Sequence, residues 1–123
     1  MGLILPLLTA IVLGCIDFGR FAHSHIAVTN AARAGAGFAS FHPVTATTQP
    51  VWEQRTREAV VAELGDTFDA TKIDMPSPVM ATDSDGLKRV SVQVTYPFET
   101  LVDWPGIPSQ MNLSRTVEMR VIR

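Results

Sequence analysis

Asp17 and Arg20 are the charged residues whose place in the sequence most needs a chemical explanation. The fifteen residues before them, from Gly2 to Ile16, carry no charge. Residues three apart lie on one face of a helix, so the two charges can neutralise each other there. Ionised groups beside an apolar segment are costly and are usually paired or functional. Two interpretations stay open: the pair forms within one helix, or it forms between neighbouring copies and sets their axial register.

Asp83 and Asp85 are followed by Gly86, as at the start of a calcium-binding loop. The twelfth position of such a loop, counted from Asp83, holds Val94 instead of a bidentate glutamate. This stretch is also a strong turn sequence. We therefore expect a turn, with Asp83 and Asp85 as weak candidates for a surface calcium contact, and no dedicated metal site.

The remaining groups that could bind a metal or attack a substrate are poorly placed for either. His23 and His25 would lie on opposite sides of a helix, so they cannot chelate one ion. Cys15 is the only cysteine and lies within the apolar run. Neither a G-x-S-x-G nucleophile motif nor a phosphate-binding G-x-x-x-x-G-K-[ST] motif is present. We expect a non-enzymatic protein without a cofactor.

Charge is distributed unevenly along the chain. The first fifty residues carry three charges, and the remaining 73 carry eight Lys/Arg and eleven Asp/Glu. The whole chain has a net charge of −2 and no cluster of basic residues, so nucleic-acid binding is not expected. The asymmetry indicates an apolar stalk joined to an ordinary water-exposed module.

The apolar run admits three interpretations: a cleavable signal, a membrane span, or a buried core helix. A signal would need a basic start and a small-residue cleavage site, and Gly14-Cys15-Ile16 is no such site. A core helix would normally show a polar side, and this run is apolar all round. Membrane insertion is favoured, and Pro6 affects only the first helical turns.

The elements that carry these residues form an α+β plan. One helix is expected from about residue 3 to 39; at roughly 55 Å it is longer than a bilayer core of about 30 Å. A second helix is expected from Pro50 to Leu64, ended by Gly65. Strands are expected over 71–81, 89–96 (ended by Pro97) and 113–121. The predicted units are the helix 1–40, a linker 41–50 and an exported module 51–123.

The N-terminal motifs resemble one known family. Leu5-Pro6-Leu7-Leu8, then Gly14-Cys15-Ile16-Asp17-Phe18-Gly19-Arg20, then Thr29-Asn30-Ala31-Ala32-Arg33, are similar in order and spacing to TadE-like proteins. These are pilin-related proteins of tight-adherence (Flp-type) pilus systems. The resemblance implies that the matching positions take part in subunit packing: Pro6, Asp17, Phe18, Gly19, Arg20, Asn30 and Arg33.

The resemblance implies a structural or assembly subunit, with the minor-pilin role as one option, that polymerises through its N-terminal helix. Its expected partners are further copies or related pilins, inner-membrane lipid and the pilus assembly machinery. The expected path is a single-pass inner-membrane protein that later enters a surface filament. The alternative is an exported binding or assembly module that stays anchored in the inner membrane and never polymerises.

Overall fold

The computed structural model describes residues 2–42, 44–66 and 68–121. Their elements are α1 (Ile4–Phe41), α2 (Gln49–Leu64), the short 3-10 helix η1 (Ala70–Lys72), β1 (Val79–Thr82), β2 (Lys88–Glu99) and β3 (Gln110–Arg120). The strands form one antiparallel sheet in the order β1-β2-β3. The predicted α+β fold, with a long apolar helix, a second helix and a three-stranded sheet, is confirmed.

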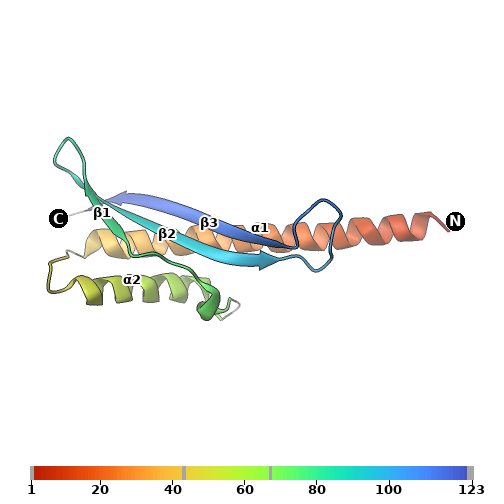
Figure 1. The fold of residues 1–123 in the computed structure, drawn as a ribbon, viewed down its shortest axis with the longest axis horizontal. Helices are drawn as coiled ribbons and strands as arrows, with labels where there is room; N and C mark the ends of the chain where they lie inside the picture. Colours follow the sequence, from red (N-terminus) through yellow and green to blue (C-terminus); the bar gives the residue numbers. More distant parts are fainter. Residues whose placement is uncertain (1, 43, 67, 122–123) are drawn as a thin grey trace.

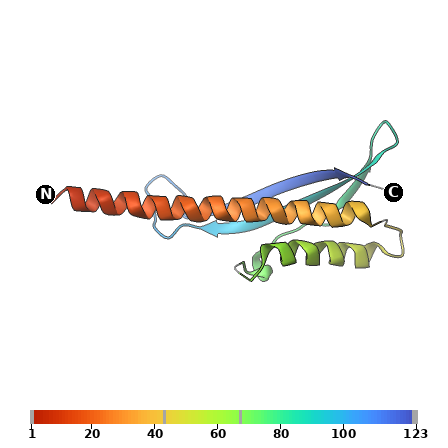
Figure 2. The same ribbon diagram turned by 180° about the vertical axis from the view of Figure 1, so that it is seen from behind.

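The elements pack in two layers (Figures 1 and 2). α1 lies along the back of β2 and β3, and α2 runs antiparallel beside α1. The N-terminal turns of α1 extend well beyond the rest of the molecule, and the β2–β3 loop lies beside the helix on that side. The β1–β2 turn lies at the opposite end.

α1 is one continuous helix of 38 residues whose surroundings change along its length. Its first half exposes large apolar side chains such as Leu5, Leu8 and Ile11. Its second half buries a stripe of small residues, which lets the helix backbone come close to its neighbours: Val28, Ala31, Ala32, Ala36 and Ala39. The helix therefore anchors the core with one half and leaves most large apolar side chains of the other half exposed in the monomer.

α2 begins at Gln49, one residue before the predicted start, and Pro50 occupies its first turn. Gly65 ends it with φ at +72° and donates its N–H to the Val61 carbonyl at 3.1 Å. Thr56 is fully buried in the packed face of α2, where its hydroxyl donates to the Trp52 carbonyl at 2.8 Å. The predicted linker's Pro43 lies outside the described residues.

β2 is longer than predicted. Val90, Val92 and Val94 are fully buried, as the alternation predicts. The prediction that Pro97 ends the strand was wrong, because Pro97 pairs opposite Asn112 and the strand runs to Glu99. β1 is paired only with the first residues of β2. The nitrogen of Pro97 faces the side of β2 away from β3, and β1 does not extend that far. A proline without an N–H is therefore tolerated at this position.

The segment before β2 is only partly a strand. Residues 71–81 were predicted as one strand-like stretch, but η1 occupies its start and β1 is confined to Val79–Thr82. Between them Asp74 forms an isolated antiparallel bridge with Thr95, with N–H to carbonyl distances of 2.9 and 2.8 Å. Pro76 and Pro78 lie between that bridge and β1, where they would interrupt a ladder.

Candidate functional site

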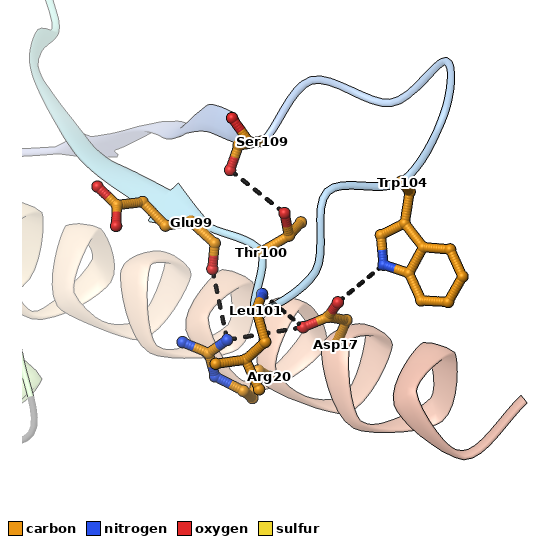
Figure 3. Close-up of polar contacts among 7 residues, drawn as sticks. All are labelled: Asp17, Arg20, Glu99, Thr100, Leu101, Trp104 and Ser109. Atoms are coloured by element: carbon orange, nitrogen blue, oxygen red, sulfur yellow. Dashed lines mark hydrogen bonds and ion pairs between the residues drawn. The ribbon is translucent and has the colours of Figure 1, made fainter. Parts of the chain in front are cut away.

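Asp17 is the best-connected polar residue of the N-terminal half of α1 (Figure 3). It is buried, although its neighbours Ile16 and Phe18 are exposed. Its carboxylate accepts a hydrogen bond from the backbone N–H of Leu101 at 3.0 Å and one from the indole Nε1–H of Trp104 at 2.9 Å. Both donors belong to the loop between β2 and β3, so Asp17 fastens that loop to the helix.

Arg20 fastens the end of β2 to the same turn of α1. Its guanidinium lies 3.7 Å from the Asp17 carboxylate and donates to the Glu99 carbonyl at 3.4 Å. The same group lies 5.5 Å from the centre of the Phe98 ring, within the range of a cation–π contact. Phe21, one residue further along, meets Phe98 edge-on at 5.6 Å.

The Asp17–Arg20 pair is thus seen within one chain, with further partners on the loop. The carboxylate is shared by one ion pair and two hydrogen bonds, and charge-assisted hydrogen bonds of this kind are the stronger ones. A role of either residue between neighbouring subunits stays a prediction. Any such contact would have to form beside, or in exchange for, the bonds to the loop.

An apolar groove of about 550 Å³ opens where the loop lies against α1. Gly14 forms part of its floor, and a Cβ built there would meet the Trp104 ring at 3.9 Å, an ordinary contact distance. Large apolar side chains from both elements line it, together with Ala10: Ile11 and Phe18 from α1, and Trp104 and Ile107 from the loop. The groove can hold apolar groups, and Asp17 is the one charged residue among the described residues that line it.

The other residues predicted for subunit packing are spread along α1. Pro6, Gly19, Asn30 and Arg33 are all exposed, and Phe18, at 72% exposure, lies at the groove. Asn30 and Arg33 border a shallow hollow that also includes Arg115 of β3. The structure therefore brings Asp17, Phe18 and Arg20 together and leaves Pro6, Asn30 and Arg33 elsewhere on the helix.

The candidate metal residues form a turn. Asp83 accepts the N–H of Gly86 at its carbonyl (2.9 Å), and its carboxylate lies 2.6 Å from the Arg89 guanidinium. Gly86 has φ at +78°, the left-handed conformation that the turn requires. Within residues 2–42, 44–66 and 68–121, no three His, Cys, Asp or Glu side chains gather as a metal site would need.

His23 and His25 lie against aromatic rings. His25 stacks on Phe21 at 6.2 Å, and His23 stacks on Phe68 at 6.1 Å. Cys15 is exposed in the first half of α1.

Sequence reasoning missed the residues that complete the site. Leu101, Trp104 and Phe98 come from the sheet and its loop, more than 75 residues from Asp17 and Arg20. The one usable signal was the stretch Trp104-Pro105-Gly106-Ile107, a turn sequence with two large apolar side chains. A partly buried indole N–H usually finds an acceptor, and the Asp17 carboxylate can accept further hydrogen bonds beside its pairing with Arg20.

Comparison with known proteins identifies a family match over the N-terminal part of the chain. The model of a family described as TadE-like protein matches residues 1–37, which confirms the resemblance seen in the motifs. Curated proteins and solved structures gave no match. α1 is also long and apolar enough, by length and composition, to cross a membrane.

Proposed function

We propose that this chain, a pilus-associated and pilin-like protein by its TadE-like N-terminal segment, is a subunit that polymerises through α1. The observation that carries the proposal is the exposed apolar surface on the first half of α1, where Leu5, Leu8 and Ile11 are all exposed. A helix that is apolar all round is stable only inside a membrane or packed against other apolar surfaces. The inner membrane would provide the apolar surroundings before assembly, and a bundle of like helices would provide them afterwards.

The same helix continues under the sheet, so that each copy would present one unsatisfied apolar half and one folded module. A contact between different surfaces of identical copies does not close on itself and yields a filament. Expected partners are further copies or related pilins and the assembly machinery that inserts them.

Electron microscopy of sheared surface material, combined with mass spectrometry for this chain, tests the proposal. We expect filaments that contain the chain, and their loss in an Ile11→Lys variant that buries a charge in the bundle. The matched control is Leu87→Lys, because Leu87 is also an exposed apolar residue but lies in the β1–β2 turn. Filaments that lack the chain, or that survive Ile11→Lys unchanged, would count against polymerisation through α1.

A second candidate function is supported by the contacts of Asp17. Its carboxylate is occupied by the chain's own loop, which favours a membrane-anchored exported module that does not polymerise. Electron microscopy of the sheared material separates the two candidates, because only a polymerising subunit appears in filaments. A charge exchange tests whether Asp17 and Arg20 pair between subunits. If Asp17 and Arg20 pair between subunits, each single change to Ala leaves the other charge buried without a partner, at a cost of about 3–5 kcal/mol per contact. Each change should then abolish filaments while the protein stays in the membrane.

The double change Asp17→Arg with Arg20→Asp should then restore some assembly, because a pair between subunits only needs opposite charges. It cannot restore the bonds to the loop, because an arginine at position 17 accepts nothing from the Trp104 indole or the Leu101 N–H. Recovery by the exchange would favour pairing between subunits. Normal filaments in both single variants would exclude it.

A further inference from the structure

The β2–β3 loop lies beside turns of α1 that belong to the apolar run. Trp104 and Ile107 line the same groove as Ala10, Ile11 and Gly14. Any position of a bilayer that takes residues 3–16 into hydrocarbon therefore brings this part of the loop to a similar depth. The loop cannot be placed in bulk water while those helical turns are in lipid.

We propose that the loop of residues 100–109 is a second membrane contact, which inserts Leu101, Trp104 and Ile107 into the interfacial layer of a phospholipid bilayer. The inference rests on the membrane anchoring in the proposed function, and it adds a second part of the chain that contacts the bilayer. Leu101 and Ile107 are 61% and 52% exposed, and together with Trp104 they give one short loop three large apolar side chains. Tryptophan is enriched at the boundary between lipid and water, where its ring is in an apolar layer and its N–H is bonded.

Part of the loop's backbone is already hydrogen-bonded within the protein. Irregular backbone near hydrocarbon is tolerated only where its polar groups are bonded by the protein. Pro105 and Pro108 have no N–H to satisfy. The N–H groups of Thr100 and Ile107 bond to carbonyls of the loop at 3.0 and 3.2 Å, and the Leu101 N–H bonds to Asp17.

Asp17 thereby acquires a role that its charge alone did not indicate. Its carboxylate satisfies a backbone N–H and the indole N–H of the loop, so it holds the loop against the helix at the membrane boundary. Asp103, exposed in the same loop, sets the limit of insertion, because an unpaired carboxylate is costly in hydrocarbon. The loop is an interfacial contact and not a spanning element.

Depth measurements on the full chain test the proposal. In the full chain, Cys15→Ser removes the native thiol and Ile107→Cys introduces a single cysteine for an environment-sensitive fluorophore. The labelled protein is placed in vesicles of phosphatidylethanolamine and phosphatidylglycerol. The matched control is Leu87→Cys, an exposed apolar position in the hairpin at the other end. We expect the label at 107 to be quenched severalfold more by spin-labelled lipid than the label at 87, and severalfold less by aqueous iodide.

Two further variants connect the result to Asp17. With Asp17→Ala, quenching of the 107 label by lipid should fall towards that of the 87 label, because the loop is released. Asp17→Asn keeps one acceptor oxygen and should retain part of the quenching. A 107 label that is quenched by lipid to the same extent with and without Asp17 would overturn the holding role of that residue.

Flotation of the vesicles in a density gradient measures separately whether the chain is anchored in the membrane. If the chain floats with the vesicles while the labels at 107 and 87 behave alike, the loop contact is overturned and the anchoring stands. If the chain does not float, both fail. A third outcome is a 107 label that is shielded from iodide but is not quenched by spin-labelled lipid. If this shielding is lost when the protein is diluted with lipid, a second copy covers the groove, and the proposed contact with lipid is overturned.

Discussion

At the residue scale, Gly35 lies where α1, α2 and β2 come closest together. A Cβ built on Gly35 would lie 2.5 Å from Cγ2 of Val60 and 3.3 Å from Cγ1 of Val92. Both valines are fully buried, so moving either side chain must displace other atoms of the core. We expect Gly35→Ala to lower the free energy of unfolding by about 1–3 kcal/mol through overpacking, measured by chemical denaturation in detergent micelles.

Gly37 is the control for this prediction, because nothing lies within 4 Å of a Cβ built there. Gly37→Ala should be neutral or raise stability by about 0.5–1 kcal/mol, since alanine is the better helix former. Combining Gly35→Ala with Val60→Ala should recover part of the loss, because it removes the closest methyl group. Equal effects of the two single alanines would contradict the close packing at Gly35.

The candidate site shows what a sequence can and cannot reveal about single residues. The charge-free run made Asp17 conspicuous, and the spacing to Arg20 predicted a helical pair, which lies at 3.7 Å. Its bond to Trp104 joins residues 87 positions apart. That contact depends on how the sheet is laid along α1, and no local pattern encodes such a placement.

At the scale of elements, the alternation of β2 predicts which substitutions the sheet tolerates. Val92 is fully buried opposite Val117, whereas Gln93 is exposed and donates to the Ser114 hydroxyl at 3.1 Å. Val92→Asp should unfold the module at a cost of several kcal/mol, because it buries an unpaired carboxylate. Gln93→Asp should be nearly silent. Circular dichroism melts of both variants test the strand register, and similar losses would show it to be wrong.

The start of η1 predicts a pH dependence. The Thr71 hydroxyl and the Thr71 backbone N–H both donate to the Asp69 carboxylate and hold its pKa below the ordinary value of 3.8. A depressed pKa stabilises the folded state above the unfolded value, and this contribution is lost as the pH falls through the folded value. η1 should therefore loosen only in acid below about pH 4.

Carboxyl NMR titration measures this directly. Thr71→Ala should raise the Asp69 pKa towards 3.8, because it removes the leading cause of the depression. Lys72→Gln should raise it less, since the charge of Lys72 is the smallest contribution. A larger effect from Lys72 than from Thr71 would contradict the hydrogen-bonded cap.

The elements were predictable where one local force dominates. The apolar and alanine-rich content predicted α1, and the strict alternation of residues 89–96 predicted β2. The errors occur where tertiary context decides. Pro97 looked like a strand end, yet it stays in β2 because its N–H would have faced no partner strand. Residues 71–81 split between η1 and β1, a division that their mixed composition did not indicate.

At the scale of the whole molecule, the two halves of α1 should be separable by truncation. A chain starting at Leu13 loses only exposed helical turns and keeps Gly14, Asp17 and the buried stripe. It should be soluble and monodisperse in water and should unfold cooperatively, as size-exclusion chromatography and thermal melts would show. Aggregation of this chain would mean that the first turns contribute to folding.

A chain starting at Phe41 should behave differently. It lacks the stripe of Val28, Ala31, Ala32, Ala36 and Ala39 that covers the inner face of the sheet. The valines of β2 would then form an exposed apolar patch, and we expect partial insolubility. A monodisperse, cooperatively melting product from this second truncation would contradict the packing of the sheet on α1.

The direction of the strands has a mechanical consequence. β2 and β3 run alongside α1, and their pairing extends from Arg89 opposite Arg120 to Glu99 opposite Gln110 (Figure 1). Tension applied along the helix would load these hydrogen bonds in shear, so that they resist together. Tension across the helix would peel them apart one after another. The module is therefore expected to be stiff along the helix axis and weak across it, the anisotropy that a link in a stretched fibre requires.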